Sequence, residues 1–264
     1  MLKISHVSKT FNKGTVNEKK ALSDLNLTIE DGDFITVIGG NGAGKSTLLN
    51  LIAGVYPPDC GHIVLNQREI ALLPEHKRAK FIGRVFQDPL MGTAADMEIA
   101  ENLSFAARRG QRRTLRWGST KQEHEKFKKQ LAELGLGLED RLTSKVGLLS
   151  GGQRQALTLL MASLQKPELL LLDEHTAALD PLTAKIVLDL TQKIVEADHL
   201  TTVMITHNMN DAIRMGNRLI MLYNGKIIYD VRGAAKKALT VEDLHKKFTE
   251  AAGTEFSDDR AVLI

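Results

Sequence analysis

Apolar positions along the chain alternate between short runs and longer stretches with a helical period. Short apolar runs indicate strands, and apolar residues that recur every three or four positions indicate helices. The runs predict strands near Ile4, Leu25, Ile35, Val64, Val85, Leu170, Val203, Leu219 and Ile227. The longer stretches predict helices at Ser46–Ala53, Glu98–Ala107, Gln122–Leu134, Gly152–Gln165, Pro181–Ala197 and Asn208–Met215. This alternation favours an α/β fold with a mostly parallel sheet, and we expect an N-terminal antiparallel β part as well.

The same pattern divides the chain. Strand signals vanish between Asp88 and Lys166, where helical signals dominate, which predicts a helical subdomain at about 88–166 inserted in the α/β core. The last residues, 231–264, hold one helix-like stretch, Thr240–Ala252, and are too few for a typical independent domain. We therefore expect a main domain over residues 1–230, followed by a short helical tail.

Composition is that of an ordinary globular protein, with 43% hydrophobic and 25% charged residues. The strongest apolar run, Leu169–Leu172, is far shorter than the ~20 residues of a membrane-spanning helix. The first residues lack the apolar core of a secretion signal, so we expect a cytoplasmic chain. Cys60 is the only cysteine, which excludes an internal disulfide and fits a reducing compartment.

The formal net charge is only +3, but basic residues gather in one segment. Arg108–Lys129 holds nine Lys and Arg residues against Glu123 and Glu125. This segment is either a solvated helical face or a contact with membrane headgroups or a partner.

A glycine-rich segment, Gly39–Ser46, lies between a predicted strand and a predicted helix and fits the pattern G-x-x-x-x-G-K-[ST] of phosphate-binding loops. Glycines let the backbone direct its N–H groups at phosphate oxygens, and the helix adds the positive end of its dipole. Lys45 would neutralise the β- and γ-phosphates, and the Ser46 hydroxyl would bind Mg²⁺. We assign to nucleotide binding Gly39, Gly40, Asn41, Gly42, Ala43, Gly44, Lys45, Ser46 and Thr47.

Two adjacent acids follow the run Leu169–Leu172, which is apolar throughout, as a parallel strand covered on both faces would be. Ligands of open α/β sheets lie at the carboxyl ends of strands, where Asp173 and Glu174 are placed. We expect Asp173 to hold Mg²⁺. Glu174, one residue further on, points elsewhere and can take a proton from the attacking water.

The string L-S-G-G-Q, Leu149–Gln153, opens the predicted helix before these acids. A serine hydroxyl and two glycine N–H groups at a helix N-terminus form a second anion site. With the phosphate loop and the acids, this string resembles the signature of ATP-binding-cassette (ABC) ATPases, and the resemblance covers about residues 1–229. It implies that the nucleotide is ATP, and that its γ-phosphate is capped by a second copy of the chain, arranged head to tail, through Ser150, Gly151, Gly152 and Gln153.

The resemblance assigns further roles by position. Gln87, in V-F-Q-D-P, matches the glutamine that touches Mg²⁺ and the attacking water. His207 matches the histidine that contacts the γ-phosphate and orients the catalytic site. Phe11 matches the aromatic residue that stacks on adenine, with core packing as the alternative. Asp180, at the end of the string that starts at Asp173, is grouped with the nucleotide-binding residues.

Three positions depart from the family pattern. The string D-E-H-T-A-A-L-D has His175 in place of proline, and we interpret this histidine as a loop-packing residue. Ala177 replaces a serine whose hydroxyl helps tie the two subunits together in the family. Gly40 replaces the commoner proline or serine of the phosphate loop and is expected to loosen it.

A single cassette without a membrane span implies a subunit of a transporter assembled from separate chains, as in bacterial importers. Its implied partners are membrane permease subunits that dock near Gln87, a second copy of itself and an extracytoplasmic substrate-binding protein, and its implied place is the inner face of the cell membrane. With its Arg-rich segment 108–117 and the string D-E-H-T-A-A-L-D, the sequence resembles a subgroup associated with a lipoprotein-type binding protein and a compact permease. For this subgroup we expect small organic solutes, such as amino acids including aromatic ones.

The alternative is a soluble ABC ATPase that serves cluster assembly or DNA repair. The basic residues lack the interleaved aromatic residues that strand binding favours, and the sequence has no long coiled-coil insert. We therefore expect no nucleic-acid partner.

Overall fold

The computed structural model describes residues 1–111 and 120–253 of the chain. Contacts between residues divide the chain into two units. The first joins residues 1–78 to the part that begins at residue 200, and the second comprises residues 79–199. Part of the basic segment Arg108–Lys129 lies outside the described residues.

The first unit begins with an antiparallel sheet. Its strands follow the order β2 (Lys19–Ile29), β1 (Leu2–Phe11), β4 (Cys60–Leu65) and β5 (Arg68–Glu69). Along β1, Leu2 and Ile4 are buried and Lys3 between them is exposed, so one face packs against the core and the other is polar. The predicted N-terminal antiparallel part is confirmed.

A mostly parallel sheet forms the centre of the same unit. β3 (Phe34–Gly39) runs parallel to both of its neighbours, β8 (Thr202–Ile205) and β9 (Arg218–Tyr223). β10 (Lys226–Arg232) pairs antiparallel with β9. Every residue of β3 is buried, as expected of a parallel strand that is covered on both faces.

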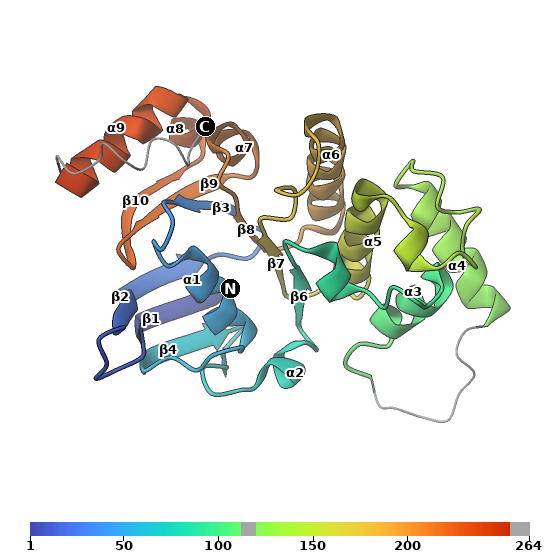
Figure 1. Cartoon of the computed structure of the whole chain (residues 1–264), viewed down its shortest axis with the longest axis horizontal. Helices are drawn as coiled ribbons and strands as arrows, with labels where there is room; N and C mark the ends of the chain where they lie inside the picture. Colours follow the sequence, from blue (N-terminus) through green and yellow to red (C-terminus); the bar gives the residue numbers. More distant parts are fainter. Residues whose placement is uncertain (112–119, 254–264) are drawn as a thin grey trace. The chain divides into compact units, whose positions relative to one another are not determined.

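Helix α1 (Lys45–Ala53) contacts β2 and β3 and lies between the two sheets in Figure 1. Its last turn is closed by Arg78 of α2 (Glu75–Arg78), which is only 1% exposed. The Arg78 guanidinium donates to the Leu51 and Ile52 carbonyls at 2.6 and 2.8 Å. A cation that satisfies the last carbonyls of a helix also interacts favourably with the helix dipole, so Arg78 holds the end of α1 in place.

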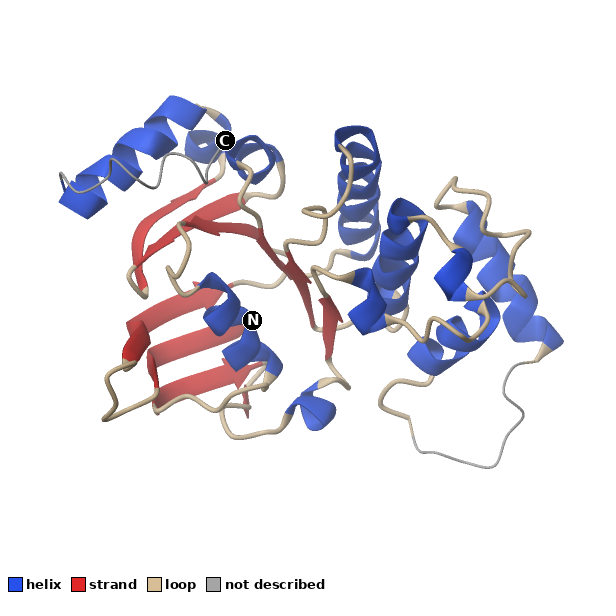
Figure 2. Cartoon of the chain, in the orientation of Figure 1, coloured by secondary structure: helices blue, strands red, loops and turns tan. Residues whose placement is uncertain are grey.

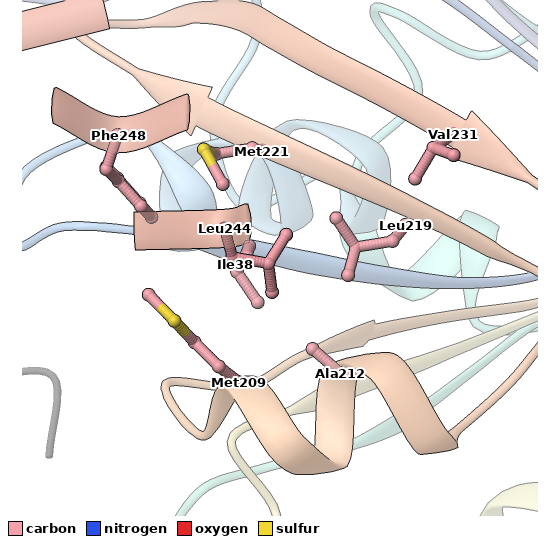
Figure 3. Close-up of a cluster of buried hydrophobic side chains, with 8 residues drawn as sticks. All are labelled: Ile38, Met209, Ala212, Leu219, Met221, Val231, Leu244 and Phe248. Carbon is pink, nitrogen blue, oxygen red and sulfur yellow. The ribbon is translucent and has the colours of Figure 1, made fainter. Parts of the chain in front are cut away.

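The C-terminal helices belong to the first unit. α7 (Met209–Arg214) contacts β3, and α8 (Ala234–Lys237) and α9 (Val241–Ala252) follow β10. Figure 3 shows the buried cluster that α7 and α9 share with the sheet, made of Ile38, Met209, Ala212, Leu219, Met221, Val231, Leu244 and Phe248. Burial of the α9 members of this cluster confirms an ordered helix in the tail, whereas the domain boundary at residue 230 stays a prediction.

The second unit contains the parallel strands β6 (Ile82–Val85) and β7 (Leu169–Asp173). Helix α6 (Pro181–Asp198) follows β7. Between β6 and β7 the described residues form helices and loops (Figure 2), with an isolated bridge between Glu98 and Lys145. These helices are η1 (Pro89–Gly92), α3 (Ile99–Ala107), α4 (Lys121–Ala132), η2 (Val146–Leu148) and α5 (Gly151–Ser163). The predicted helical character of this region is confirmed, and its limits as a subdomain, 88–166, stay a prediction.

Side-chain caps explain where three of these helices begin. Thr120 and Glu123 form a capping box at the start of α4, and Ser150 and Gln153 form one at the start of α5. Asp180 caps α6 and is followed by a proline at the first helical position. Each cap satisfies backbone N–H groups that the first turn leaves without a helical acceptor. In the part of the chain that the structure describes, no helix is both long and apolar enough to span a bilayer.

Candidate functional site

The predicted phosphate loop connects β3 to α1 in the first unit. Gly39 ends β3, and Gly44 is the N-cap of α1 with a left-handed φ of 104°. A Cβ atom on Gly39 would lie 2.4 Å from the Leu222 carbonyl oxygen, and one on Gly44 would lie 2.5 Å from that of Ala21. Both positions therefore require glycine, because the strands β9 and β2 pass directly beside the loop.

Lys45 folds back over the loop that precedes it. Its side chain is buried, and its ammonium group donates to the carbonyls of Gly39 and Gly40 at 2.6 and 3.1 Å. These bonds hold a positive charge at the centre of the loop. The predicted role of Lys45 at the β- and γ-phosphates is compatible with this position.

The N-terminus of α1 differs from those of α5 and α6. Its N-cap is Gly44, which has no side chain to accept from the first N–H groups, whereas Ser150 and Asp180 cap their own helices. Uncapped N–H groups and the positive end of the helix dipole attract an anion. Asn41, Gly42 and Ser46 are exposed, Thr47 is half-buried and Ala43 is buried. The loop therefore fits a phosphate chain that approaches from solvent.

His207 and the loop leave the first-unit sheet at the same edge. β3 and β8 are parallel neighbours, with Val37 opposite Ile205, and the Thr206 N–H donates to the Val37 carbonyl at 3.2 Å. Gly39 and His207 thus follow adjacent strand ends, which is where ligands of open α/β sheets bind. His207 is exposed, and its contact with a γ-phosphate stays a prediction.

Phe11 ends β1 and is half-buried. Its ring meets the Tyr56 ring edge-on, with 5.4 Å between centroids and 81° between planes. The Lys9 ammonium lies 5.6 Å from the Phe11 centroid. Phe11 is therefore outside the fully buried core, which favours the stacking role over core packing without testing it.

The second unit carries Gln87, Asp173 and Glu174 at one end of its two strands. Val85 of β6 lies opposite Leu172 of β7. Because the strands are parallel, Gln87 and Glu174 leave the pair at the same edge. Gln87 is exposed, and Asp173 and Glu174 are half-buried. The expectation that Asp173 and Glu174 lie at the carboxyl end of a strand is met within this unit.

Asp173 has a partner that the sequence analysis missed. Arg84 of β6 forms an ion pair with Asp173, with 3.3 Å between Nη2 and Oδ2. The Arg84 guanidinium also lies 4.5 Å from the centroid of the Phe86 ring, a cation–π contact. The only signal for Arg84 in the sequence is a charged residue inside an otherwise apolar strand.

The predicted metal donors fit Mg²⁺ by their chemistry. Ser46, Gln87 and Asp173 offer hydroxyl, amide and carboxylate oxygens, which are the hard ligands that Mg²⁺ takes. No group of three or more His, Cys, Asp and Glu residues that could hold a metal occurs within residues 1–111 and 120–253.

Glu174 has an unusual backbone conformation. Its φ is +42°, in the left-handed region that residues with a side chain rarely adopt. Such a conformation costs of order 1–3 kcal/mol and persists where the surrounding structure enforces it. The chain therefore turns immediately after Asp173, the last residue of β7.

The loop after Glu174 is anchored by His175, which is 2% exposed. His175 Nε2 lies 3.0 Å from the Thr191 hydroxyl, which itself donates to the Val187 carbonyl at 2.8 Å. Since the hydroxyl proton is used by Val187, His175 Nε2 carries the hydrogen and donates to Thr191. His175 therefore ties the loop to α6, in agreement with its interpretation as a packing residue.

We expect His175 to make stability depend on pH. Burial lowers the pKa of His175 from 6.5 to about 4. As the pH falls through this window, the unfolded chain takes up a proton at this position and the folded chain does not, so the free energy of unfolding decreases, by about 2 kcal/mol between pH 7 and pH 5. The variant His175→Gln should lack this part of the loss, as measured by urea unfolding at both values. The matched control is His245→Gln, an exposed histidine. An equal loss in wild type and His175→Gln would contradict the prediction.

The string Leu149–Gln153 begins α5. The Ser150 hydroxyl accepts from the Gln153 N–H at 3.3 Å, and the Gln153 side chain accepts from the Ser150 N–H at 3.2 Å. A hydroxyl that accepts one bond keeps its own hydrogen to donate. Ser150 can therefore cap α5 and still donate to an anion.

Gly151 and Gly152 pack against the start of α6. A Cβ atom on Gly152 would lie 2.1 Å from Thr183 Cγ2, and one on Gly151 would lie 3.3 Å from Leu179 Cδ2. Asp180 accepts from the Thr183 N–H at 3.1 Å, and its hydrogen bonds with Thr183 lower the pKa of the Asp180 carboxyl. The structure thus brings Asp180 and the glycines of the string together at Thr183.

Comparisons with known proteins identify the family of the chain. The family model described as ABC transporter matches residues 22–177, more than half of the chain. A tyrosine transport ATP-binding protein of Clostridioides difficile (strain R20291) is 45% identical over 255 residues, which cover 95% of this chain and 100% of the relative. A methionine import ATP-binding protein of Enterococcus faecalis (strain ATCC 700802 / V583) is 36% identical over 231 residues, which cover 86% of this chain and 64% of the relative.

A solved structure extends the similarity to a nucleotide-bound state. The ATP-binding cassette MJ0796, in a dimeric post-hydrolysis state bound to ADP and phosphate, matches with a TM-score of 0.75 and 29% identity. The match covers 88% of this chain and 98% of that cassette. The family model and these relatives, together with the phosphate loop and the two acids at the end of β7, show that the chain belongs to the ABC transporter family. It is an ATP-binding subunit that hydrolyses ATP.

Proposed function

We propose that this chain powers the uptake of a small organic solute, such as an amino acid, through separate permease subunits in the membrane. The observation that carries the proposal is the phosphate loop, in which a buried lysine and an uncapped helix N-terminus are built to hold a phosphate chain. Transport of tyrosine by the relative of Clostridioides difficile and import of methionine by that of Enterococcus faecalis support the substrate class.

In the proposed mechanism the phosphate chain is held by the loop Gly39–Thr47. Lys45 and the N-terminus of α1 offset its negative charge. Ser46, Asp173 and Gln87 would hold Mg²⁺, which would supply further charge neutralisation at the phosphates. Glu174 accepts the proton of the attacking water, and Phe11 stacks on the adenine.

A head-to-tail dimer is part of this proposal. A serine hydroxyl with a hydrogen to donate and two glycines at the N-terminus of α5 form an anion site that suits the γ-phosphate of ATP bound to a second copy. His207 and Asp180 complete the proposed nucleotide contacts. The dimeric state of the cassette bound to ADP and phosphate supports dimer formation.

Permease subunits would dock on the surface that follows Gln87. Leu90 and Met91 of η1 are 48% and 70% exposed, and Phe105 of α3 is 65% exposed. Leu90 and Met91 are adjacent in the chain, and exposed apolar side chains that form a contiguous patch mark a protein contact. The chain would thereby lie on the inner face of the cell membrane, in a system that also includes an extracytoplasmic substrate-binding protein.

Serine at both Leu90 and Met91 should uncouple transport without changing the isolated subunit. Basal ATPase activity should stay within about two-fold of wild type, because exposed substitutions rarely cost much stability. Co-purification with the permease and substrate uptake should both be lost. The control is Leu72→Ser, an 83% exposed leucine in the first unit. Full uptake and co-purification by the double variant would exclude this surface as the docking site.

Affinity purification of the native protein in mild detergent tests the transport role itself. Two hydrophobic permease chains should co-purify, and the complex in vesicles should accumulate labelled tyrosine only when ATP is present. Recovery of soluble scaffold proteins in their place would favour the alternative, a role in cluster assembly or DNA repair.

A further inference from the structure

A second lysine lies beside the phosphate loop. Lys19 opens β2 and is exposed. A Cβ atom on Gly42 would lie 2.9 Å from Lys19 Nζ and 3.8 Å from Lys19 Cε. The end of the Lys19 side chain therefore covers the backbone of Gly42, at an exposed point of the loop.

The strand register places Lys19 next to the proposed adenine contact as well. Phe11 and Lys19 are directly opposite in the antiparallel pair of β1 and β2. Cα atoms in such pairs are about 4.5–5.5 Å apart. The Lys19 backbone thus lies beside Phe11, and its ammonium group lies beside Gly42. The side chain therefore extends between the proposed adenine site at Phe11 and the proposed phosphate site in the loop.

Charges around Lys19 favour an external anion. Lys9 and Lys13 both form ion pairs with Asp59, and the neighbouring Glu18 side chain accepts from the Gly14 N–H. Within residues 1–111 and 120–253, Lys19 forms no ion pair of its own. Its ammonium group instead adds positive charge to a loop that already holds Lys45.

We propose that Lys19 is a further nucleotide-binding residue, whose ammonium group contacts the phosphate chain at Gly42. The proposal rests on the proposed binding of ATP by the loop. Lys45 holds the phosphates from the buried side, and Lys19 closes on them from the solvent side. A triphosphate carries several negative charges, so two cations on opposite sides of it neutralise more charge than one.

Binding of ATP, ADP and adenosine by isothermal titration calorimetry tests the proposal. Lys19→Met should weaken ATP and ADP binding about three- to ten-fold, the effect of an exposed charged hydrogen bond. It should leave adenosine binding unchanged, because adenosine has no phosphate. Lys19→Arg should retain most of the affinity. Raising the salt concentration should reduce the difference between wild type and Lys19→Met.

Lys20→Met is the matched control, since Lys20 is the next residue, is exposed and lies opposite Thr10 on the other side of the strand. Both variants remove one positive charge. An equal loss of ATP and ADP affinity in both would show that only the net charge of the protein matters, which would overturn the proposal. Unchanged ATP and ADP affinity in a folded Lys19→Met variant would overturn it as well. If folded wild-type protein binds neither ATP nor ADP, the proposed function itself is wrong. This result differs from failure of the Lys19 proposal alone, in which wild type binds both nucleotides.

Discussion

Replacing Glu174 by glutamine is expected to lower the ATPase rate at least about 100-fold, the usual share of a general base. Glutamine has nearly the same shape but cannot take the proton of the attacking water. Phosphate contacts by Lys45 and the α1 N-terminus are unaffected, so ATP affinity should stay within a few-fold of wild type. ATP that binds but is not hydrolysed should then favour the closed dimer, because the closed state is the one that both anion sites prefer.

The left-handed backbone conformation at Glu174 should be the same in wild type and Glu174→Gln. Glutamine and glutamate adopt a positive φ equally poorly, so the turn after β7 should be kept. Steady-state ATPase assays and sedimentation with and without ATP are the measurements. Glu196→Gln, which removes an exposed carboxylate from α6, should match wild type in both. Turnover of Glu174→Gln within a few-fold of wild type, or a monomer in the presence of ATP, would refute the assignment of the base.

The parts of the fold that the sequence predicted are those that local patterns control. Leu169–Leu172 was predicted as a strand covered on both faces, and all four leucines are fully buried. The helix predicted at Gly152–Gln165 is α5, which ends at Ser163. Periodicity extends the prediction past the end of the helix, because Leu164 continues the apolar pattern as the C-cap.

Features that depend on distant partners were missed. Arg84 and Asp173 are 89 positions apart in the sequence, and Arg78 reaches back to carbonyls of α1. Hydrophobic periodicity identifies elements along the chain, but it does not identify which distant residue a charged side chain will contact. β5, α2 and α8 were missed for another reason: strands of two residues and helices of four are too short to show a period.

The residues of the candidate site could be proposed from the sequence because they lie in three short segments. Gly39–Thr47, Leu149–Gln153 and the pair Asp173–Glu174 each combine a backbone geometry with the groups that use it. The structure confirms the local geometry of each segment, in the left-handed Gly44, the Ser150 cap and the strand end at Asp173. The roles of the individual side chains toward ATP stay predictions.

Replacing Lys45 by alanine should act one step earlier than the change at Glu174. The phosphates lose a charge-assisted donor worth about 1.5–3 kcal/mol, so ATP affinity should fall about 10- to 150-fold. The loss should be similar for ADP if Lys45 mainly holds the β-phosphate, and larger for ATP if it also holds the γ-phosphate. Calorimetry with both nucleotides separates these cases, and unchanged affinity for both would contradict the phosphate-loop assignment.

The same variant also removes the bonds from Lys45 to the Gly39 and Gly40 carbonyls, so a disordered loop could mimic the loss of charge. Lys45→Arg keeps the charge but cannot place a larger guanidinium in the same buried space. Lys45→Met loses the charge and the bonds to the two carbonyls, as Lys45→Ala does, but it keeps most of the buried stem that packs beneath the loop. If charge is the cause, Lys45→Met should bind ATP as weakly as Lys45→Ala while melting close to wild type. If the loop is the cause, Lys45→Met should lie between wild type and Lys45→Ala in both affinity and melting temperature, with adenosine binding reduced in parallel.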